Sequence, residues 1–252
     1  MDVDIALTTA ALAGAGLLVG SFLGLVSLRL PAGGGVVTGR SRCGGCRRDL
    51  APWRMIPVLS WAIARGRCGD CGAPIPVRYP VIESVAGLIG VWAALTQADP
   101  VGAVLTALLG WQLLLLAVVD AEHFWLPDAL TFPLAASGLA AALSLPGVTA
   151  IDSLIGAAAG FGGLWAIAWL YRRLRGRDGL GGGDPFMLGA GGAWVGWIGL
   201  PSVLLWASAA AFSLVAARLL LRRQVSGQDR LPFGVFLAIG IWCVWLWGPL
   251  GL

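Results

Sequence analysis

Two aspartates stand at the ends of apolar runs in this chain of 252 residues, where acid–base chemistry is possible. Asp120 closes the run "LLLLAVVD", and Asp184 follows three glycines in "GLGGGDPFML". A carboxylate is disfavoured at the C-terminal end of a helix, where the helix dipole is negative. An ionisable side chain at the edge of a membrane-spanning segment is therefore a candidate for function.

Asp120 and Asp184 are expected to face each other if the helices that carry them pack together. Two carboxylates that share a site do not both ionise easily, so one of them keeps a proton. The ionised group would activate water, and the protonated group would donate to the carbonyl oxygen of a peptide bond. Glycines 181–183 leave room for a substrate backbone beside Asp184. The pattern leaves two interpretations open: a catalytic pair, or a helix end and a polar loop at the interface.

Three other titratable residues follow Asp120 in the same loop, and a fourth, Glu83, stands at the start of the second span. Asp128 follows a proline and is predicted to be the N-cap of the next helix. His123, the single histidine, and Glu122 are interpreted as interfacial, solvated groups. Glu83 is predicted to pair with Arg78 at the start of a span, and a polar role toward a cofactor is the alternative.

Four cysteines form a second constellation, in the motifs "CGGC" at 43–46 and "CGDC" at 68–71. A CxxC turn places two thiolates on one metal ion, and two such turns complete a tetrahedron. Four thiolates leave no open coordination position, so the predicted metal is a structural zinc ion. Four free or redox-active thiols are the alternative. The predicted ligands are Cys43, Cys46, Cys68 and Cys71.

The composition indicates a membrane protein. Hydrophobic residues make up 58% of the chain and charged residues only 12%, whereas a soluble domain carries about 25% charged residues. The mean hydropathy is +0.84. A membrane-spanning helix needs about 20 mostly apolar residues, so the sequence predicts an all-α polytopic membrane protein of about eight spans. These spans are expected near 5–28, 81–97, 101–119, 129–145, 151–171, 186–199, 201–221 and 232–250.

The arginines predict which side of the membrane each connection occupies. All 17 basic residues are arginines: nine in segment 29–80, four in 172–185 and four in 218–230. Because arginine-rich connections stay in the cytoplasm, these segments and both aspartates are predicted to be cytoplasmic and both termini periplasmic. The predicted organisation is a first transmembrane helix at 1–30, a cytoplasmic zinc segment at 31–80 and a transmembrane catalytic domain at 81–252.

The motifs taken together resemble those of the bacterial type IV prepilin peptidases, which are GxGD-type aspartyl proteases of the inner membrane. The first span ends in "GSFLGLVSLRLP", and the two CxxC motifs follow it. "VVDAEHFWLPDALTFPL" resembles the first aspartate motif of the family, and "GGGDPFMLGAGGAWVGW" resembles its GxGD motif. "LPFGVFLAIG" is similar to the last helix of the family.

The resemblance implies an enzyme that removes the leader peptide of type IV prepilins or type II secretion pseudopilins, after a glycine, at the cytoplasmic face. It implies Asp120 and Asp184 as the catalytic pair. Many members also N-methylate the new amino terminus with S-adenosylmethionine, but the sequence contains no Rossmann glycine fingerprint to locate that cofactor. The expected surroundings are the lipid bilayer and the pilin substrate, without nucleic acid.

Two positions depart from the family pattern. Phe186 stands where the family usually has a lysine, and Gly24 stands where it usually has an asparagine. One alternative function is a zinc-stapled membrane scaffold or transporter that uses the aspartates as ion or proton ligands. A transporter, however, more often places such groups near the middle of the membrane. A second alternative, prompted by Phe186, is an inactive homologue.

Overall fold

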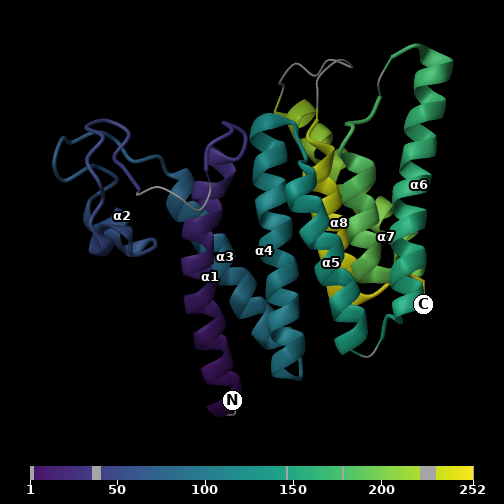
Figure 1. Cartoon of the computed structure of the whole chain (residues 1–252), viewed down its shortest axis with the longest axis horizontal. Coiled ribbons are helices and arrows are strands. Elements are labelled where there is room, and N and C mark those ends of the chain that lie inside the picture. The colour runs from purple at the N-terminus through teal and green to yellow at the C-terminus, as the bar shows by residue number, and fades with distance from the viewer. Residues whose placement is uncertain (1–2, 36–40, 146, 178, 222–230, 252) are drawn as a thin grey trace. The chain divides into compact units, whose positions relative to one another are not determined.

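The regular structure of this protein is helical (Figure 1), as the sequence predicts. The computed structural model describes residues 3–35, 41–145, 147–177, 179–221 and 231–251. Within these ranges the β-structure consists only of isolated bridges in the cysteine segment. Five of the described helices are long and apolar enough to cross a membrane, and two shorter apolar helices accompany them. Four of the arginines used to predict orientation lie outside the described residues: Arg40, Arg222, Arg223 and Arg230.

The chain forms two compact units, Met1–Trp111 and Gln112–Leu252. The first unit is built on helices α1 (Val3–Arg29) and α3 (Arg78–Thr96), together with the first part of α4 (Pro100–His123). Glycines bring α1 and α3 together: a Cβ atom on Gly90 would meet the carbonyl oxygen of Leu12, far inside contact distance. Small residues of this kind let helix backbones approach closely in membranes.

The cysteine segment lies between α1 and α3 in the sequence and contains two short helices. These are the 3-10 helix η1 (Pro52–Met55) and α2 (Leu59–Ile63). The indole Nε1 of Trp61 donates to the carbonyl oxygen of Ile75 at 3.0 Å, which closes the second half of the segment onto α2. Both ends of the segment are therefore fixed by membrane helices, while its interior depends on a few polar contacts.

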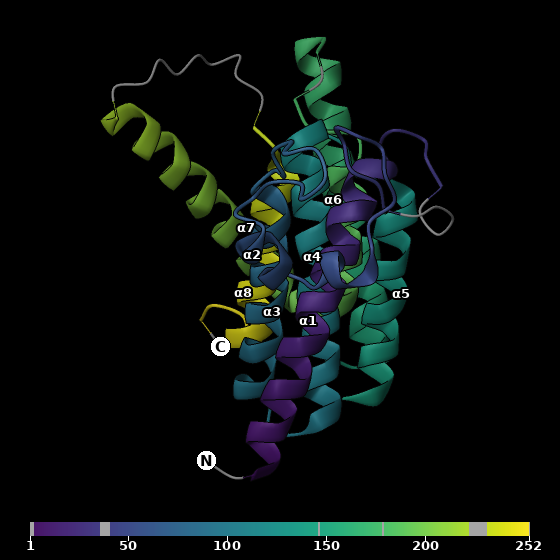
Figure 2. The ribbon, with the colours of Figure 1, turned by 90° about the vertical axis from the view of Figure 1, so that its left-hand side faces the viewer.

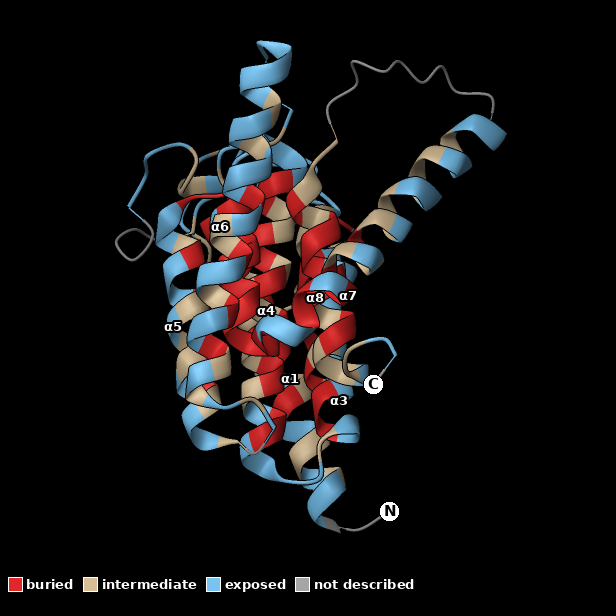
Figure 3. Cartoon of the chain, turned by 90° about the vertical axis from the view of Figure 1, so that its right-hand side faces the viewer, coloured by how far each residue is buried: buried red, intermediate tan, exposed pale blue. Residues whose placement is uncertain are grey.

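The second unit contains the last part of α4 and helices α5 (Asp128–Ser144), α6 (Ala150–Arg175), α7 (Asp184–Leu220) and α8 (Phe233–Trp247). Helix α7 packs against α5, α6 and α8. Trp194 of α7 is only 1% exposed, and its Nε1 donates to the carbonyl oxygen of Leu134 at 2.8 Å. The first part of α7 is thus the centre of this unit, and its buried residues are visible in Figure 3.

Helix α7 combines two spans that the sequence predicts separately, at 186–199 and 201–221. The structure forms one element of 37 residues with a single non-helical residue, Gly196, at φ 69° and ψ 174°. A straight helix of this length would measure about 56 Å, far more than the ~30 Å hydrocarbon core of a bilayer. After the break the chain changes direction and its exposed last turns diverge from the other helices of this unit (Figure 2).

The break at Gly196 lies five residues before Pro201, whereas the sequence predicts it at Pro201. A proline is tolerated in the first turn of a helix, because its missing N–H would have no intrahelical partner there. Gly196 instead supplies the positive φ that the change of direction requires. The predicted count of eight spans stays a prediction.

A reciprocal glycine contact joins α6 to α7. A Cβ atom on Gly156 would collide with the carbonyl oxygen of Gly192, and one on Gly192 would collide with the carbonyl oxygen of Gly156. Both obstacles are backbone atoms, which cannot rotate away as a side chain can. This contact fixes the distance between α6 and α7, and so it helps to position Asp184 at the start of α7.

We therefore expect Gly156→Ala to lower the thermal unfolding midpoint of the detergent-solubilised protein by about 2–10 °C, the range for an overpacked core. Gly163→Ala is the matched control on the same helix, because a Cβ atom at Gly163 meets nothing within 4 Å. Tryptophan fluorescence during heating measures both midpoints. Equal midpoints for the two variants would contradict the close contact.

Candidate active site and cysteine cluster

Asp120 lies in the last turn of α4, 5% exposed. Its Oδ2 accepts a hydrogen bond of 3.2 Å from the backbone N–H of Val235, which lies at the start of α8. A Cβ atom on Gly234 would lie 2.8 Å from the same oxygen, so only glycine allows this approach. The positive N-terminal end of the α8 dipole thereby offsets the repulsion between the Asp120 carboxylate and the negative C-terminal end of the α4 dipole.

Asp184 is the first residue of α7 and is 4% exposed. Its Oδ2 accepts a hydrogen bond from the backbone N–H of Gly181 at 2.9 Å. A carboxylate at a helix N-terminus is favoured by the helix dipole. The two aspartates therefore sit at opposite ends of their own helices, yet each has a backbone N–H as its partner.

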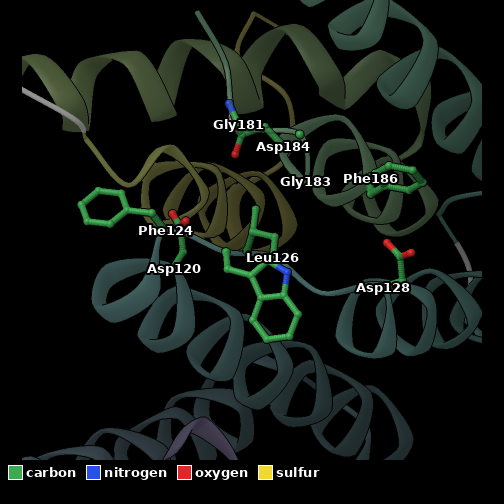
Figure 4. A pocket seen from close by; sticks show the side chains of 10 residues that line it. Asp120, Phe124, Leu126, Asp128, Gly181, Gly183, Asp184 and Phe186 are labelled. Carbon is green, nitrogen blue, oxygen red and sulfur yellow. Dashed lines mark hydrogen bonds between the residues drawn. The ribbon is translucent and has the colours of Figure 1, made fainter. Parts of the chain in front are cut away.

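Both carboxylates line one cavity of about 310 Å³ (Figure 4). The structure thus brings together the two residues that the sequence predicts as a pair, from the end of α4 and the start of α7. The rest of the lining comes from the α4–α5 connection, from α5 and from the segment around Asp184: Phe124, Trp125, Leu126, Asp128, Gly181, Gly182, Gly183 and Phe186.

The three glycines before Asp184 have different roles, although the sequence suggests one role for all. Gly181 caps the Asp184 carboxylate through its N–H. Gly183 packs on Leu126, whose Cβ would be 2.6 Å from a Cβ at that position. Only Gly182 faces open space, with nothing within 4 Å of such an atom. Room for a substrate backbone is therefore found at Gly182.

The prediction that Asp128 is the N-cap of its helix is wrong. Helix α5 begins at Asp128 itself, and its N-cap residue is Pro127, whose backbone is extended. Asp128 lines the cavity, but Figure 4 shows it beside Phe186 and across the cavity from Asp120. Glu122 and His123 are exposed and do not line the cavity, and their side chains approach each other to 4.0 Å.

Sequence reasoning did not single out Gly234, Val235 and Leu126 as parts of this site. Val235 is 115 positions from its partner Asp120, and no local pattern reports a contact across that distance. The sequence signal for this contact is Gly234, which follows Pro232 and Phe233 in "LPFG" and stands at the start of an apolar run.

The cysteine cluster brings all four predicted ligands together in the first unit. The sulfur atoms of Cys43, Cys46, Cys68 and Cys71 lie within 4.8 Å of one another. The Sγ atoms of Cys43 and Cys71 are 3.7 Å apart. Four thiolates at the usual Zn–S distance around one ion would be separated by about 3.8 Å. The cluster therefore has the size and donor set of a tetrahedral zinc site.

The two halves of the cluster repeat the same backbone turn. The N–H of Cys43 donates to the carbonyl oxygen of Arg48 at 2.9 Å, and that of Cys68 donates to Ala73 at 2.8 Å. In each turn the residue four positions after the first cysteine has a positive φ: 57° at Arg47 and 69° at Gly72.

Local hydrogen bonds favour the charged form of two side chains in this segment. Hydrogen bonds from the backbone N–H groups of Cys46 and Gly45 lower the pKa of the Cys43 thiol to about 6. Metal ligation requires the thiolate, so this turn is prepared for a cation. Arg54 of η1 forms two hydrogen bonds with Asp70 and lowers the pKa of that carboxyl group.

Glu83 has a structural partner in the cysteine segment. Its Oε2 accepts the backbone N–H of Val58 at 2.6 Å, and Val58 has a φ of 59°, which is unusual for a β-branched residue. Arg78, the partner predicted from the sequence, donates to Ser27 Oγ at 3.0 Å and to the carbonyl oxygen of Gly24 at 3.4 Å. Glu83 thus holds a strained turn of the segment against α3.

Two buried carboxylates around one cavity, in a bundle of apolar helices, are the arrangement expected of a membrane aspartyl peptidase. Two family models match the chain: the bacterial peptidase A24 N-terminal domain over residues 15–97, and the type IV leader peptidase family over residues 107–216. The second match contains both Asp120 and Asp184.

Curated proteins named prepilin leader peptidase/N-methyltransferase are similar over most of the chain. The protein of Aeromonas hydrophila is 41% identical over 83% of this chain and 72% of its own length. That of Pseudomonas aeruginosa is 36% identical over 92% of this chain and 88% of its own length. No solved structure matches. The chain therefore belongs to the bacterial type IV leader peptidase family and is a multi-pass membrane protein.

The cysteine geometry predicts about one zinc ion per chain in the purified protein. Cys43→Ser should remove most of it, because a structural site does not retain zinc well with three ligands. Cys243→Ser is the matched control, since Cys243 is a buried cysteine of α8 outside the cluster. Elemental analysis of both variants measures the metal content. Equal zinc content in both, or none in the unaltered protein, would refute the site.

Proposed function

We propose that this protein is a leader peptidase that cleaves type IV prepilins or type II secretion pseudopilins and N-methylates the new amino terminus. The observation that carries the proposal is the pair of buried aspartates on one cavity, within the region that matches the leader peptidase family. The similar curated proteins carry both activities in their names, and the family together with several apolar helices supports a location in the inner membrane.

In the proposed peptidase reaction the two aspartates have complementary roles. The ionised carboxylate takes a proton from a water molecule, whose oxygen forms a bond to the carbonyl carbon. The protonated partner donates its proton to the carbonyl oxygen. When the intermediate collapses, the C–N bond breaks and the leaving nitrogen takes up a proton from the pair. Open space at Gly182, which lines the same cavity as both aspartates, leaves room for the substrate backbone.

The proposed orientation places the active site at the cytoplasmic face. Arg172, Arg173 and Arg175 lie in the last turn of α6, nine to twelve residues before Asp184 in the chain. Arginine-rich connections favour the cytoplasmic side. On this side a polar leader peptide can reach the cavity without crossing the bilayer, while the apolar part of the substrate stays in the membrane.

The alternative of a transporter has little support from the geometry. Both aspartates lie at helix ends, whereas coupling ions in transporters are usually bound near the middle of the membrane. The alternative of an inactive homologue is also weakened. Phe186 lines the cavity in place of the lysine usual in the family, and both carboxylates remain in that cavity with it.

Two further groups belong to the proposal. Zinc would be held by the four cysteines, and it would fix the fold of the segment without taking part in catalysis. S-adenosylmethionine would supply the methyl group to the new amino terminus. None of the described residues is assigned to its binding.

Asp120→Asn and Asp184→Asn should each lower the rate of leader removal by about 10²–10⁴-fold or more, because each removes one half of the acid–base pair. Asp99→Asn is the control: Asp99 lies before α4 and accepts the N–H of Gly102, a bond that an asparagine oxygen can also accept. Mass spectrometry of a co-expressed prepilin measures cleavage. Normal cleavage by both active-site variants would overturn the proposal.

The proposed methyl transfer can be measured separately from cleavage. A peptide that already starts at the mature amino terminus should gain one methyl group from labelled S-adenosylmethionine, even with the Asp184→Asn variant. The reason is that the second reaction needs no peptide-bond hydrolysis. Absence of label with the unaltered enzyme and this peptide would restrict the function to proteolysis.

A further inference from the structure

The cysteine segment exposes a group of large apolar side chains for which neither the active site nor the metal site has a use. They lie in and beside η1 and α2, within residues 53–63, which we call the apolar stretch. Their exposed fractions are 69% for Trp53, 46% for Ile56, 54% for Leu59 and 75% for Ile63. A group of exposed apolar side chains of this kind marks a surface that binds a protein or a membrane.

Glu83 of α3 fixes the level of the apolar stretch along the membrane helices. Its Oε2 accepts the N–H of Val58, the residue directly before α2, at 2.6 Å. Glu83 comes five residues after Arg78, the first residue of α3, and so lies about 7.5 Å along that helix. Helix α2 therefore starts beside the second turn of α3 and not beyond its end. Within the first unit, Figure 1 likewise shows α2 beside the upper parts of α1 and α3.

The length of α3 relates this level to the membrane. The helix has 19 residues and is about 28 Å long, close to the ~30 Å thickness of the hydrocarbon core of a bilayer. When it spans the bilayer, its ends lie near the two boundaries of the core. Interfacial helices bury their apolar faces about 5–10 Å into the boundary between headgroups and acyl chains. The bond from Val58 to Glu83 thus holds the start of α2 at that depth.

The charge of the cysteine segment fits the same surroundings. Residues 41–77 contain six arginines and two aspartates, with no lysine and no glutamate. A zinc ion bound by four thiolates would add two negative charges, so the segment would remain positive. Basic segments next to membrane helices are attracted to anionic lipid headgroups. Tryptophan, present in the stretch as Trp53, also prefers the interface.

We propose that the apolar stretch is a lipid-binding surface, which inserts between acyl chains at the membrane face where α1 ends and α3 begins. The arginines of the segment lie around it at the level of anionic headgroups. The inference does not depend on the proposed peptidase function. Its depth beside α3 and the positive charge around it favour lipid over a protein partner from the aqueous phase. The cysteine segment is then held at the membrane by its middle as well as by its two ends.

The test uses the full-length protein in vesicles of phosphatidylethanolamine and phosphatidylglycerol, with p-benzoylphenylalanine in place of single residues. Under near-ultraviolet light its benzophenone group forms a bond to a nearby C–H carbon, and mass spectrometry of the digested protein identifies the molecule that it has joined. The test position is Ile63. Leu18, which is 65% exposed in α1, is the control for contact with lipid. Arg42, whose side chain is 66% exposed in the same segment, is the control outside the stretch.

We expect an acyl-chain adduct at position 63 in a yield comparable to that at position 18, and its loss at position 42. No adduct at position 63 beside a normal adduct at position 18 would overturn the proposal, as would equal yields at positions 63 and 42. A product that joins position 63 to a second copy of the chain, or to a co-expressed prepilin, in place of lipid would assign the surface to a protein partner and also overturn it.

The role of Glu83 in setting the depth is tested with two variants. Glu83→Leu removes the acceptor of the Val58 N–H and should abolish most of the acyl-chain adduct at position 63. Glu83→Gln keeps an oxygen acceptor and should retain the adduct. The adduct at position 18 should be the same in both variants, which shows that each is folded in the membrane. An unchanged adduct at position 63 in Glu83→Leu would refute the proposed depth.

Discussion

Burial of two carboxylates around one cavity is the constraint to which the second unit of this protein is adapted. An unpaired charge away from water is costly, and in the part of the chain that the structure describes no arginine lines the cavity that holds Asp120 and Asp184. Among the described residues the compensation comes from the backbone. The N–H groups of Val235 and Gly181 point at the two side chains, and the N-termini of α8 and α7 supply favourable dipoles. Neutral donors of this kind leave the pair free to exchange protons.

Backbone donors can reach the carboxylates only where side chains are absent. Gly234 is the clearest case, since any Cβ atom there would collide with Asp120. Further from the site, Gly156 and Gly192 bring α6 and α7 to the same closeness and set the position of Asp184. The many glycines of this chain therefore do more than fill helices in a membrane. At these positions they determine how near one backbone, or one charge, can come to another.

The sequence predicts the helical class, most of the helix positions and the meeting of the four cysteines, because these depend on hydropathy and local spacing. The approach of Asp120 to Asp184 also follows from the pattern of apolar runs and the two motifs. The sequence misplaces the break in α7, because Pro201 is the stronger local signal and Gly196 one glycine among many. It also misjudges Asp128, since a helix can begin at an aspartate without a side-chain cap. The contact of Val235 with Asp120 depends on tertiary packing, which the periodicity of the sequence does not reveal.

The repeated turns of the cysteine segment have a consequence for how this part of the chain assembles. Each turn provides two sulfurs and is incomplete alone, while α1 and α3 hold the outer ends of the segment. A metal ion between the turns would act as a reversible cross-link in a loop whose ends are already tethered. Loop closure costs little more for a long loop than for a short one. Such an ion would therefore join two turns of a loop whose ends already stay with α1 and α3.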